Sequence, residues 1–441
     1  MRLFNLLALL PSLTRPWGAK QLQPPQDGQQ HVLPAEPAPE SSASHNHGSH
    51  QGIGFAAFGD SYSAGIGTGV DGTEDDCRHG LHAHPALIAA DLAASRRLPA
   101  PDDSGANASL AFQWLSCTGA TTEDVLTGGG AGASQIDALN ASLPADFALL
   151  SVGGNDLGFF DVINACVFRF YGSYSGTCAA ALAAADALLA SPAFEDRLRA
   201  ALLEILDRGL RAGRPRFAVT VTGYARFFDA ETRGCDERSL GVWWGGGGPP
   251  LTREVRRRLN GLVDAANARI GRAVDEVNGR FSLPGRRPGV LFVDYDAAFE
   301  GHRLCEPGVE EPAYNRTETW FFLVGGEDNA RNETAAAAAA VGDLPARPVL
   351  PLRDAALADP DVCLGPAQRS GDWGELALCY MAMARQRDPS LRPAHDGVMA
   401  ENSMWYVPTS YGKVLHPRTL GHEAIRDKIY EAWRKHGYKN M

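Results

Sequence analysis

The chain has 441 residues, 44% of them apolar and 21% charged, and its formal net charge at pH 7 is −11. This much apolar material is enough for one large buried core. Because an acidic chain without a run of Lys and Arg does not attract phosphate groups, the composition excludes nucleic acid and anionic membrane surfaces as partners.

The first 51 residues predict a secretory leader followed by an unstructured tract. Residues 1–19 begin with one basic residue, Arg2, and a short apolar run, which is typical of a signal peptide and too short for a stable membrane anchor. Residues 20–51 are rich in Gln, Pro, Ser and His and contain almost no large apolar side chain, so they cannot bury a core. We therefore expect a secreted, extracellular protein with one folded domain over residues 52–438.

In that domain, short apolar runs alternate with helical patterns. The runs have the length of buried strands and are bounded by Gly, Pro, Asp or Ser; they are Gly54–Phe58, Leu110–Leu115, Phe147–Val152, Phe217–Val221 and Val290–Val293. Helical patterns are found in four stretches. Residues 84–94 and 179–212 are rich in Ala and Leu, and residues 252–278 and 420–435 have apolar side chains at helical spacing. Strands that alternate with helices predict an α/β fold in which a mostly parallel sheet is covered by helices on both faces.

Two stretches, residues 228–251 and 300–410, do not fit this alternation. We expect them to be insertions or long loops over one end of the sheet, where the sites of such folds lie. Aromatic side chains gather in them, namely Trp243, Trp244, Trp320, Phe321 and Phe322. These residues could form a hydrophobic lip for acyl chains, a platform that stacks sugars, or the core of the insertions. The sequence leaves the three interpretations open.

Two further features agree with secretion. Eight cysteines without zinc-ligand spacing favour disulfide bonds over a metal site, with buried free thiols as the alternative. We predict pairing of neighbours in chain order among Cys77, Cys117, Cys166, Cys178, Cys235, Cys305, Cys363 and Cys379. Four N-x-S/T sequons indicate exposed, glycosylated loops at Asn107, Asn140, Asn315 and Asn332.

Candidate catalytic residues follow the first three strands and precede the last helix. Ser61 comes directly after the first strand, where a hydroxyl faces the crevice of such a sheet. Gly119, after the second strand, lets a backbone N–H approach a substrate closely, and Asn155, after the third, offers a side-chain amide that suits an oxyanion. His416 precedes a proline and the last helix, and it is the best candidate for a general base.

Taken together, these segments resemble the SGNH (GDSL-type) hydrolases. The resemblance rests on GDSY after the first strand and on SCTGATTEDVL, SVGGNDLGF and LHPRTLGHEAI, which are similar to segments of secreted actinobacterial and fungal esterases and lipases. It implies a three-layer α/β/α sandwich with a five-stranded, flavodoxin-like sheet and large loop insertions. It also implies a carboxylic ester hydrolase in which Ser61 is the nucleophile and His416 the base, with Ser61, Gly119 and Asn155 forming the oxyanion hole.

One position departs from the family pattern. The family usually has an aspartate three residues before its histidine, where this chain has Lys413. We therefore expect a Ser–His dyad in which a main-chain carbonyl, that of Lys413, accepts the Nδ1 proton of the imidazole. An acid from elsewhere in the chain is the alternative, although Asp60 is expected to cap a helix instead.

The reaction expected is acyl transfer from a carboxylic ester to water through an acyl-enzyme on Ser61, without a metal or an organic cofactor. The expected substrates are small-molecule, lipid or acylated-carbohydrate esters, and we expect a monomer. Two other functions remain open from the sequence. One is a polysaccharide O-acetyl esterase of the same fold, and the other is a secreted binding protein that has lost its activity.

Overall fold

The computed structural model describes residues 54–69, 75–96, 110–129, 134–168, 177–240, 249–281, 289–331 and 409–438, together with the single residue Gly365. Several predictions fall on residues outside these ranges. They concern the signal peptide, the linker, and the residues Asn107, Asn332, Trp243, Trp244, Cys363 and Cys379. The five strands and the last helix all lie within the described residues.

Five strands form one parallel sheet. They are β1 (Gly54–Gly59), β2 (Ala111–Trp114), β3 (Phe147–Ser151), β4 (Ala218–Thr222) and β5 (Val290–Val293). Their order in the sheet is β2-β1-β3-β4-β5, and every pairing is parallel. Because the chain moves outward from β1 to β2 and then crosses back to β3, the order reverses between β1 and β3. Ligand sites of open α/β sheets lie at the carboxyl ends of the strands beside such a reversal.

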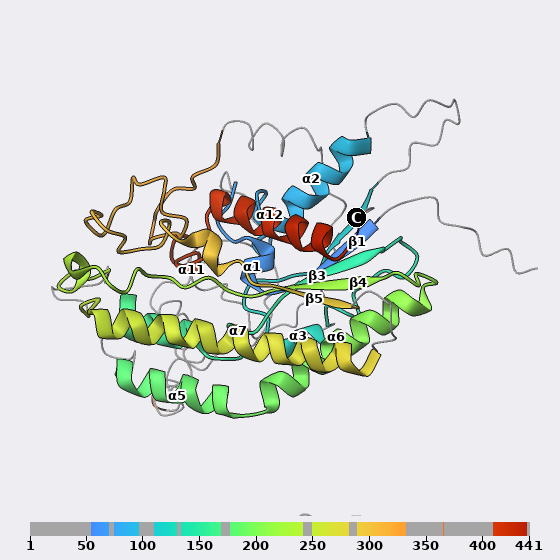
Figure 1. The fold of residues 1–441 in the computed structure, drawn as a ribbon, viewed down its shortest axis with the longest axis horizontal. Helices are drawn as coiled ribbons and strands as arrows, with labels where there is room; N and C mark the ends of the chain where they lie inside the picture. The colour runs from blue at the N-terminus through green and yellow to red at the C-terminus, as the bar shows by residue number, and fades with distance from the viewer. Residues whose placement is uncertain are drawn as a thin grey trace, which may run out of the picture. The chain divides into compact units, whose positions relative to one another are not determined.

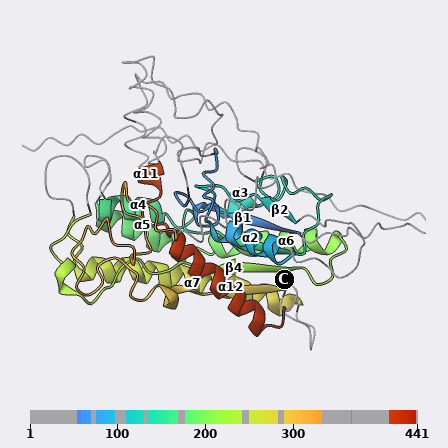
Figure 2. The ribbon, with the colours of Figure 1, turned by 90° about the horizontal axis from the view of Figure 1, so that it is seen from above.

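Helices cover both faces of the sheet, as predicted (Figure 1). On one face lie α2 (His84–Arg96) and α12 (Thr419–Lys435), which Figure 2 shows from above over the strands. On the other face lie α3 (Thr122–Val125), α6 (Ala193–Arg211) and α7 (Arg253–Phe281). The flavodoxin-like three-layer α/β/α fold is therefore confirmed. The shorter elements are α1 (Ser61–Ala64), α4 (Phe159–Ile163), α11 (Thr409–Gly412), a π-helical turn (Asn164–Phe168) and 3₁₀ turns at Arg233–Cys235 and Asp296–Phe299.

The helix predicted over residues 179–212 is in fact two helices. The first is α5 (Cys178–Ala190), and α6 begins at Ala193 after the capping residue Pro192. Proline lacks the N–H that a continuous helix would need at this position, so the chain bends there by 54°. Among the described residues, no single helix is long and apolar enough to cross a membrane, and only the bent α5–α6 pair reaches that length and composition.

The core is built on strands whose side chains are buried on both faces. Phe55 of β1 stacks between Phe112 of β2 and Phe147 of β3, with ring centroids 4.5 and 4.8 Å apart. From above, Trp433 of α12 meets Phe147 edge-on at 4.9 Å and donates its indole N–H to the Thr220 hydroxyl at 2.8 Å. Burial of these rings contributes to the stability of the core, and the indole donor is satisfied.

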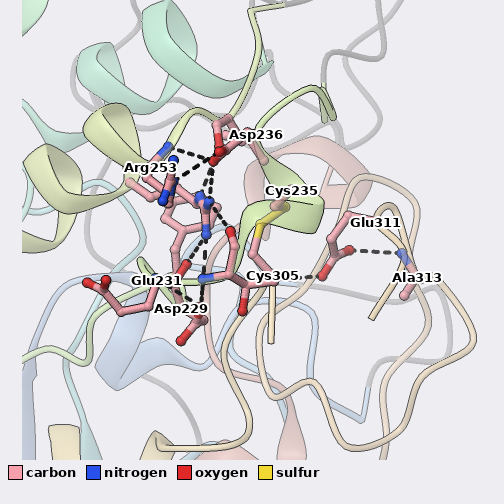
Figure 3. The surroundings of a disulfide bond; sticks show 12 residues. Asp229, Glu231, Cys235, Asp236, Arg253, Cys305, Glu311 and Ala313 are labelled. Carbon is pink, nitrogen blue, oxygen red and sulfur yellow. Dashed lines mark hydrogen bonds and ion pairs between the residues drawn. A yellow bond between two sulfur atoms is a disulfide. The ribbon is translucent and has the colours of Figure 1, made fainter. Parts of the chain in front are cut away.

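Three of the predicted disulfide bonds form, each between cysteines that are neighbours in chain order. They are Cys77–Cys117, Cys166–Cys178 and Cys235–Cys305, and no described cysteine is free. The third joins the two stretches predicted as insertions (Figure 3). Beside it, the fully buried Arg256 of α7 donates to the Asp236 carboxylate at 2.8 Å and to the Thr232 carbonyl at 2.5 Å. This guanidinium therefore anchors the first of those stretches to α7.

The described part of the aromatic run belongs to the core. Phe321 and Phe322 are buried, and the Phe321 ring packs against Phe227 and Phe299 at 5.6 and 5.2 Å. Trp320 is half-buried, and its ring stacks on the His302 imidazole at 3.6 Å. Of the three interpretations left open by the sequence, the packing of these residues supports the core of the insertion.

Candidate active site

Ser61 lies where β1 meets α1, at the carboxyl end of the sheet. Gly59 makes the turn with φ of +123°, and a Cβ at this position would lie 1.9 Å from the Ser151 carbonyl oxygen, so only glycine fits. Asp60 then caps α1 by accepting the N–H of Tyr62 at 2.9 Å, as predicted. Ser61, the first residue of α1, is 7% exposed, so its hydroxyl lies in a largely dry environment.

His416 is 355 positions away in the sequence, yet its Nε2 lies 2.6 Å from the Ser61 Oγ. The loop that carries it pairs with the aromatic run, since Phe322 donates its N–H to the His416 carbonyl at 3.0 Å and accepts that of Leu415 at 2.9 Å. Leu415 has φ of +57°, a left-handed conformation that costs free energy for a residue with a branched side chain. Tertiary contacts therefore hold the histidine in place against a local preference.

A main-chain carbonyl orients the imidazole, but it is not the one predicted. The His416 Nδ1 lies 3.1 Å from the Val414 carbonyl oxygen. The Lys413 carbonyl, which the sequence predicted for this role, accepts the backbone N–H of His416 at 2.9 Å instead. The turn over residues 413–416 places the Val414 carbonyl next to the imidazole Nδ1. The Lys413 ammonium lies 4.5 Å from the centre of the Phe322 ring, in a cation–π contact.

The protonation state of His416 follows from these surroundings. Burial lowers the pKa of His416 to about 4, and the carbonyls of Val414 and Lys413 oppose that shift in part. The imidazole is therefore neutral near pH 7. With its hydrogen on Nδ1 and directed at the Val414 carbonyl, its Nε2 is free to accept the proton of the Ser61 hydroxyl.

The two other predicted residues follow the neighbouring strands. Gly119 has φ of +92° and lies two residues after Cys117, which the first disulfide bond ties to Cys77. The Asn155 side chain donates to the Ala120 carbonyl at 2.9 Å, so it joins the loop after β3 to the loop after β2 and keeps a second N–H. None of the hydrogen bonds among described residues uses the backbone N–H of Ser61 or Gly119.

A buried aspartate that the sequence interpretation missed holds these loops together. The Asp156 carboxylate accepts the N–H of Thr122 at 2.9 Å and its hydroxyl at 2.5 Å, and it pairs with Arg197 of α6 at 3.1 Å. Asp156 thus fixes the start of α3 against the loop that presents Asn155. The sequence shows an aspartate directly after Asn155, but no neighbouring residue indicates that Thr122 and Arg197 are its partners.

Tyr224 connects the serine segment to the Gly154 segment. Its buried hydroxyl donates to Asp60 at 2.8 Å and accepts the N–H of Gly154 at 2.9 Å. Burial raises the pKa of Asp60 to about 7, although the hydrogen bonds from Tyr224 and from the N–H of Tyr62 lower it in part. Tyr224 stands in no recognisable pattern after β4, so sequence reasoning had no means of finding it.

Asp328 attaches the last helix to the loop after α1. Its carboxylate accepts the N–H and hydroxyl of Thr419 at 2.9 and 2.5 Å, and the N–H of Gly69 at 2.9 Å. Burial alone would raise the pKa of Asp328, but hydrogen bonds from His82, Thr419 and Gly69 outweigh it and hold that pKa well below its usual range. The carboxylate therefore stays charged and caps α12, which begins three residues after His416.

Comparison with known proteins identifies the chain. The sequence model of the GDSL-like Lipase/Acylhydrolase family matches residues 57–314. The chain belongs to this family. It is 28% identical to a lipase of Streptomyces rimosus over 256 residues. The matched region covers 58% of this chain and 74% of that lipase. Lipase 1 of Streptomyces coelicolor is 28% identical over 253 residues, covering 57% and 73%.

One solved structure resembles part of the chain. The extracellular lipase from Streptomyces rimosus is 25% identical in the structural comparison, with a TM-score of 0.40, and covers 58% of this chain and 85% of that one. As a member of the GDSL-like Lipase/Acylhydrolase family, the chain is a carboxylic ester hydrolase, as its sequence implied. The family match ends before His416, which the fold brings to Ser61. Among the described residues, no group of three His, Cys, Asp or Glu side chains is placed to hold a metal ion.

Proposed function

We propose that this ester hydrolase is a serine esterase or lipase that works through an acyl-enzyme on Ser61, with His416 as its general base. The observation that carries the proposal is the 2.6 Å contact between the Ser61 Oγ and the His416 Nε2. It is supported by the 3.1 Å contact between the Nδ1 and the Val414 carbonyl, which orients a neutral imidazole as an acceptor.

The reaction has two half-reactions. His416 takes the proton of Ser61 as the Oγ attacks the ester carbonyl carbon, and it then protonates the leaving alcohol as the carbon–oxygen bond breaks. In the second half, His416 takes a proton from water, the hydroxide attacks the acyl-enzyme, and the Ser61 oxygen leaves with that proton. Both tetrahedral intermediates carry a negative oxygen.

That oxygen needs donors that are held in position before the reaction. We assign this role to the backbone N–H groups of Ser61 and Gly119 and to the second N–H of the Asn155 amide. All three residues follow adjacent parallel strands, and Asn155 is tied to the loop of Gly119 through Ala120. Donors fixed by such contacts do not reorganise as charge develops, which is why they lower the barrier.

We further propose that the enzyme is secreted as a monomer and acts on small-molecule or lipid esters. Three disulfide bonds support an oxidising compartment, since such bonds rarely persist in the cytosol. The resemblance to an extracellular lipase agrees with it. Among the described aromatic residues, neither a sugar-stacking platform nor a hydrophobic lip has support, because Phe321 and Phe322 are buried and the Trp320 ring stacks on His302. A panel of ester chain lengths, measured beside acetylated xylan, tests this substrate class.

A fluorophosphonate label tests the nucleophile and its position together. We expect one adduct, on the peptide that contains Ser61, and a loss of esterase activity of more than about 10⁴-fold in both Ser61→Ala and His416→Ala. Ser63→Ala is the matched control, because Ser63 lies in the same helix, is fully buried, and its hydroxyl has no partner among the described residues. An adduct elsewhere, or substantial turnover by Ser61→Ala, would refute the assignment.

A further inference from the structure

Tyr62 follows the proposed nucleophile in the sequence and contacts the proposed base in space. Its hydroxyl donates to the Leu415 carbonyl at 2.8 Å, and its ring centroid lies 5.0 Å from that of His416 at an angle of 46°. The side chain is buried, so no bulk water competes for that carbonyl. One short helix, α1, therefore carries both the serine and a contact to the histidine loop.

The carbonyl that Tyr62 holds belongs to a backbone position that needs support. Leu415 is in the left-handed region, with φ of +57°, and it is bonded directly to His416. Such a conformation persists only where surrounding contacts determine it. Two contacts do so here, namely the Tyr62 hydroxyl on the carbonyl and the Phe322 carbonyl on the N–H of Leu415.

The need for such a contact follows from the position of Lys413, where the family usually has an aspartate. A carboxylate forms a charge-assisted hydrogen bond to an imidazole, whereas the Val414 carbonyl forms a neutral and weaker one. Because this hydrogen bond is weaker, the orientation of the His416 imidazole depends more on the backbone conformation of Leu415 and His416. The contact of the Tyr62 ring with the imidazole also limits rotation of the imidazole about its side-chain bonds.

We propose that Tyr62 is a positioning residue, whose hydroxyl fixes the Leu415 carbonyl and whose ring braces His416, so that the Nε2 faces the Ser61 Oγ without a carboxylate. This inference rests on the proposed function, because it presupposes the Ser61–His416 dyad. Tyr62 contacts the Leu415 carbonyl and the imidazole ring, so it acts through the histidine. Its contribution should therefore appear in the chemical step and not in substrate binding.

The test is Tyr62→Phe, which keeps the ring and removes the hydroxyl. Tyr295→Phe is the control, because Tyr295 is also buried and its hydroxyl has no partner among the described residues. We expect Tyr62→Phe to lower kcat and the rate of fluorophosphonate inactivation by about three- to tenfold, the size expected for one neutral hydrogen bond. KM should change little, and the unfolding temperature should fall by about 2–4 °C, as expected for the loss of one hydrogen bond. Tyr295→Phe should match the wild type in kcat, in the inactivation rate and in KM.

Several outcomes would overturn this inference. One is a wild-type kcat in Tyr62→Phe, and another is a loss that appears only in KM. A third is a Tyr62→Phe chain that does not fold, because the hydroxyl would then serve the whole fold and not the histidine. If the label modifies Ser61 at the wild-type rate in Tyr62→Phe, only the positioning role fails. If Ser61 is never labelled in the wild type, the dyad itself fails.

Discussion

Replacing Asn155 by alanine removes the side-chain amide that we assign to the oxyanion hole, and the structure allows its two roles to be separated. One N–H donates to the Ala120 carbonyl at 2.9 Å, and its loss should cost about 1 kcal/mol of folding free energy. The other is assigned to the oxyanion, where loss of one fixed donor lowers kcat by about 10²–10³-fold. The second effect, about 3–4 kcal/mol in the transition state, therefore exceeds the first.

The assay compares kcat and KM on a short-chain p-nitrophenyl ester with the thermal unfolding of the same variant. We expect the fall in kcat at nearly constant KM, and a decrease in Tm of about 2–4 °C. Asn278→Ala is the control, since the Asn278 amide donates to the Val290 carbonyl at 2.8 Å and accepts the N–H of Val290 at 3.1 Å, at the amino end of β5. Because it loses two hydrogen bonds, it should lose at least as much stability as Asn155→Ala while kcat stays unchanged.

Two results would refute this reasoning. If Asn155→Ala keeps kcat within about threefold of the wild type, the amide does not stabilise the oxyanion. If Asn278→Ala loses as much activity as Asn155→Ala, the loss in both reflects weakened folding and not a missing donor. Asn155→Asp gives a further comparison, because a carboxylate has no N–H and repels an oxyanion, so its kcat should be at least as low as that of alanine.

Three other predictions concern His416, Asp60 and the first disulfide bond. Because the base must be neutral and burial lowers the pKa of His416 to about 4, kcat/KM should rise with pH through a midpoint near 4, and a midpoint near 6.5 would contradict that environment. Asp60 has a pKa of about 7 in the folded chain against 3.8 when unfolded, so the folded state binds more protons between these values. The free energy of unfolding should therefore fall by up to about 4 kcal/mol as pH rises from 4 to 7, a fall that Asp60→Asn should lack in denaturant titrations. Removing the Cys77–Cys117 bond, which closes a 40-residue separation, should cost about 2–4 kcal/mol and lower kcat by loosening the Gly119 turn; an unchanged kcat would mean that the turn holds without it.

Much of the fold could be predicted because each strand is a short apolar run bounded by turn residues, a pattern that is visible in the local sequence. Each of the five apolar runs became a strand, and the serine, glycine and asparagine that follow three of them lie at the carboxyl ends of β1, β2 and β3. The predicted helix over residues 179–212 was wrong in one respect, since the pattern concealed the break at Pro192. Chain order was also a sound guide to the three described disulfide bonds, since each joins two cysteines that are neighbours in the sequence.

The contacts that complete the site were beyond the reach of the sequence. The carbonyl beneath His416 belongs to Val414 and not to Lys413, because the choice depends on the turn of a loop that pairs with Phe322. Tyr224 and Asp328 bridge segments far apart in the chain, and neither stands in a periodic pattern.

By itself, the sequence determined which segments become strands and helices and which polar residues follow them, because apolar periodicity and turn residues act over a few positions. Tertiary structure alone decided how those residues meet: which carbonyl orients the imidazole, which hydroxyl supports the strained Leu415, and whether Phe321 and Phe322 face solvent or core. The physical reason is that hydrogen bonds and burial between distant segments depend on distances that exist only after the chain has packed.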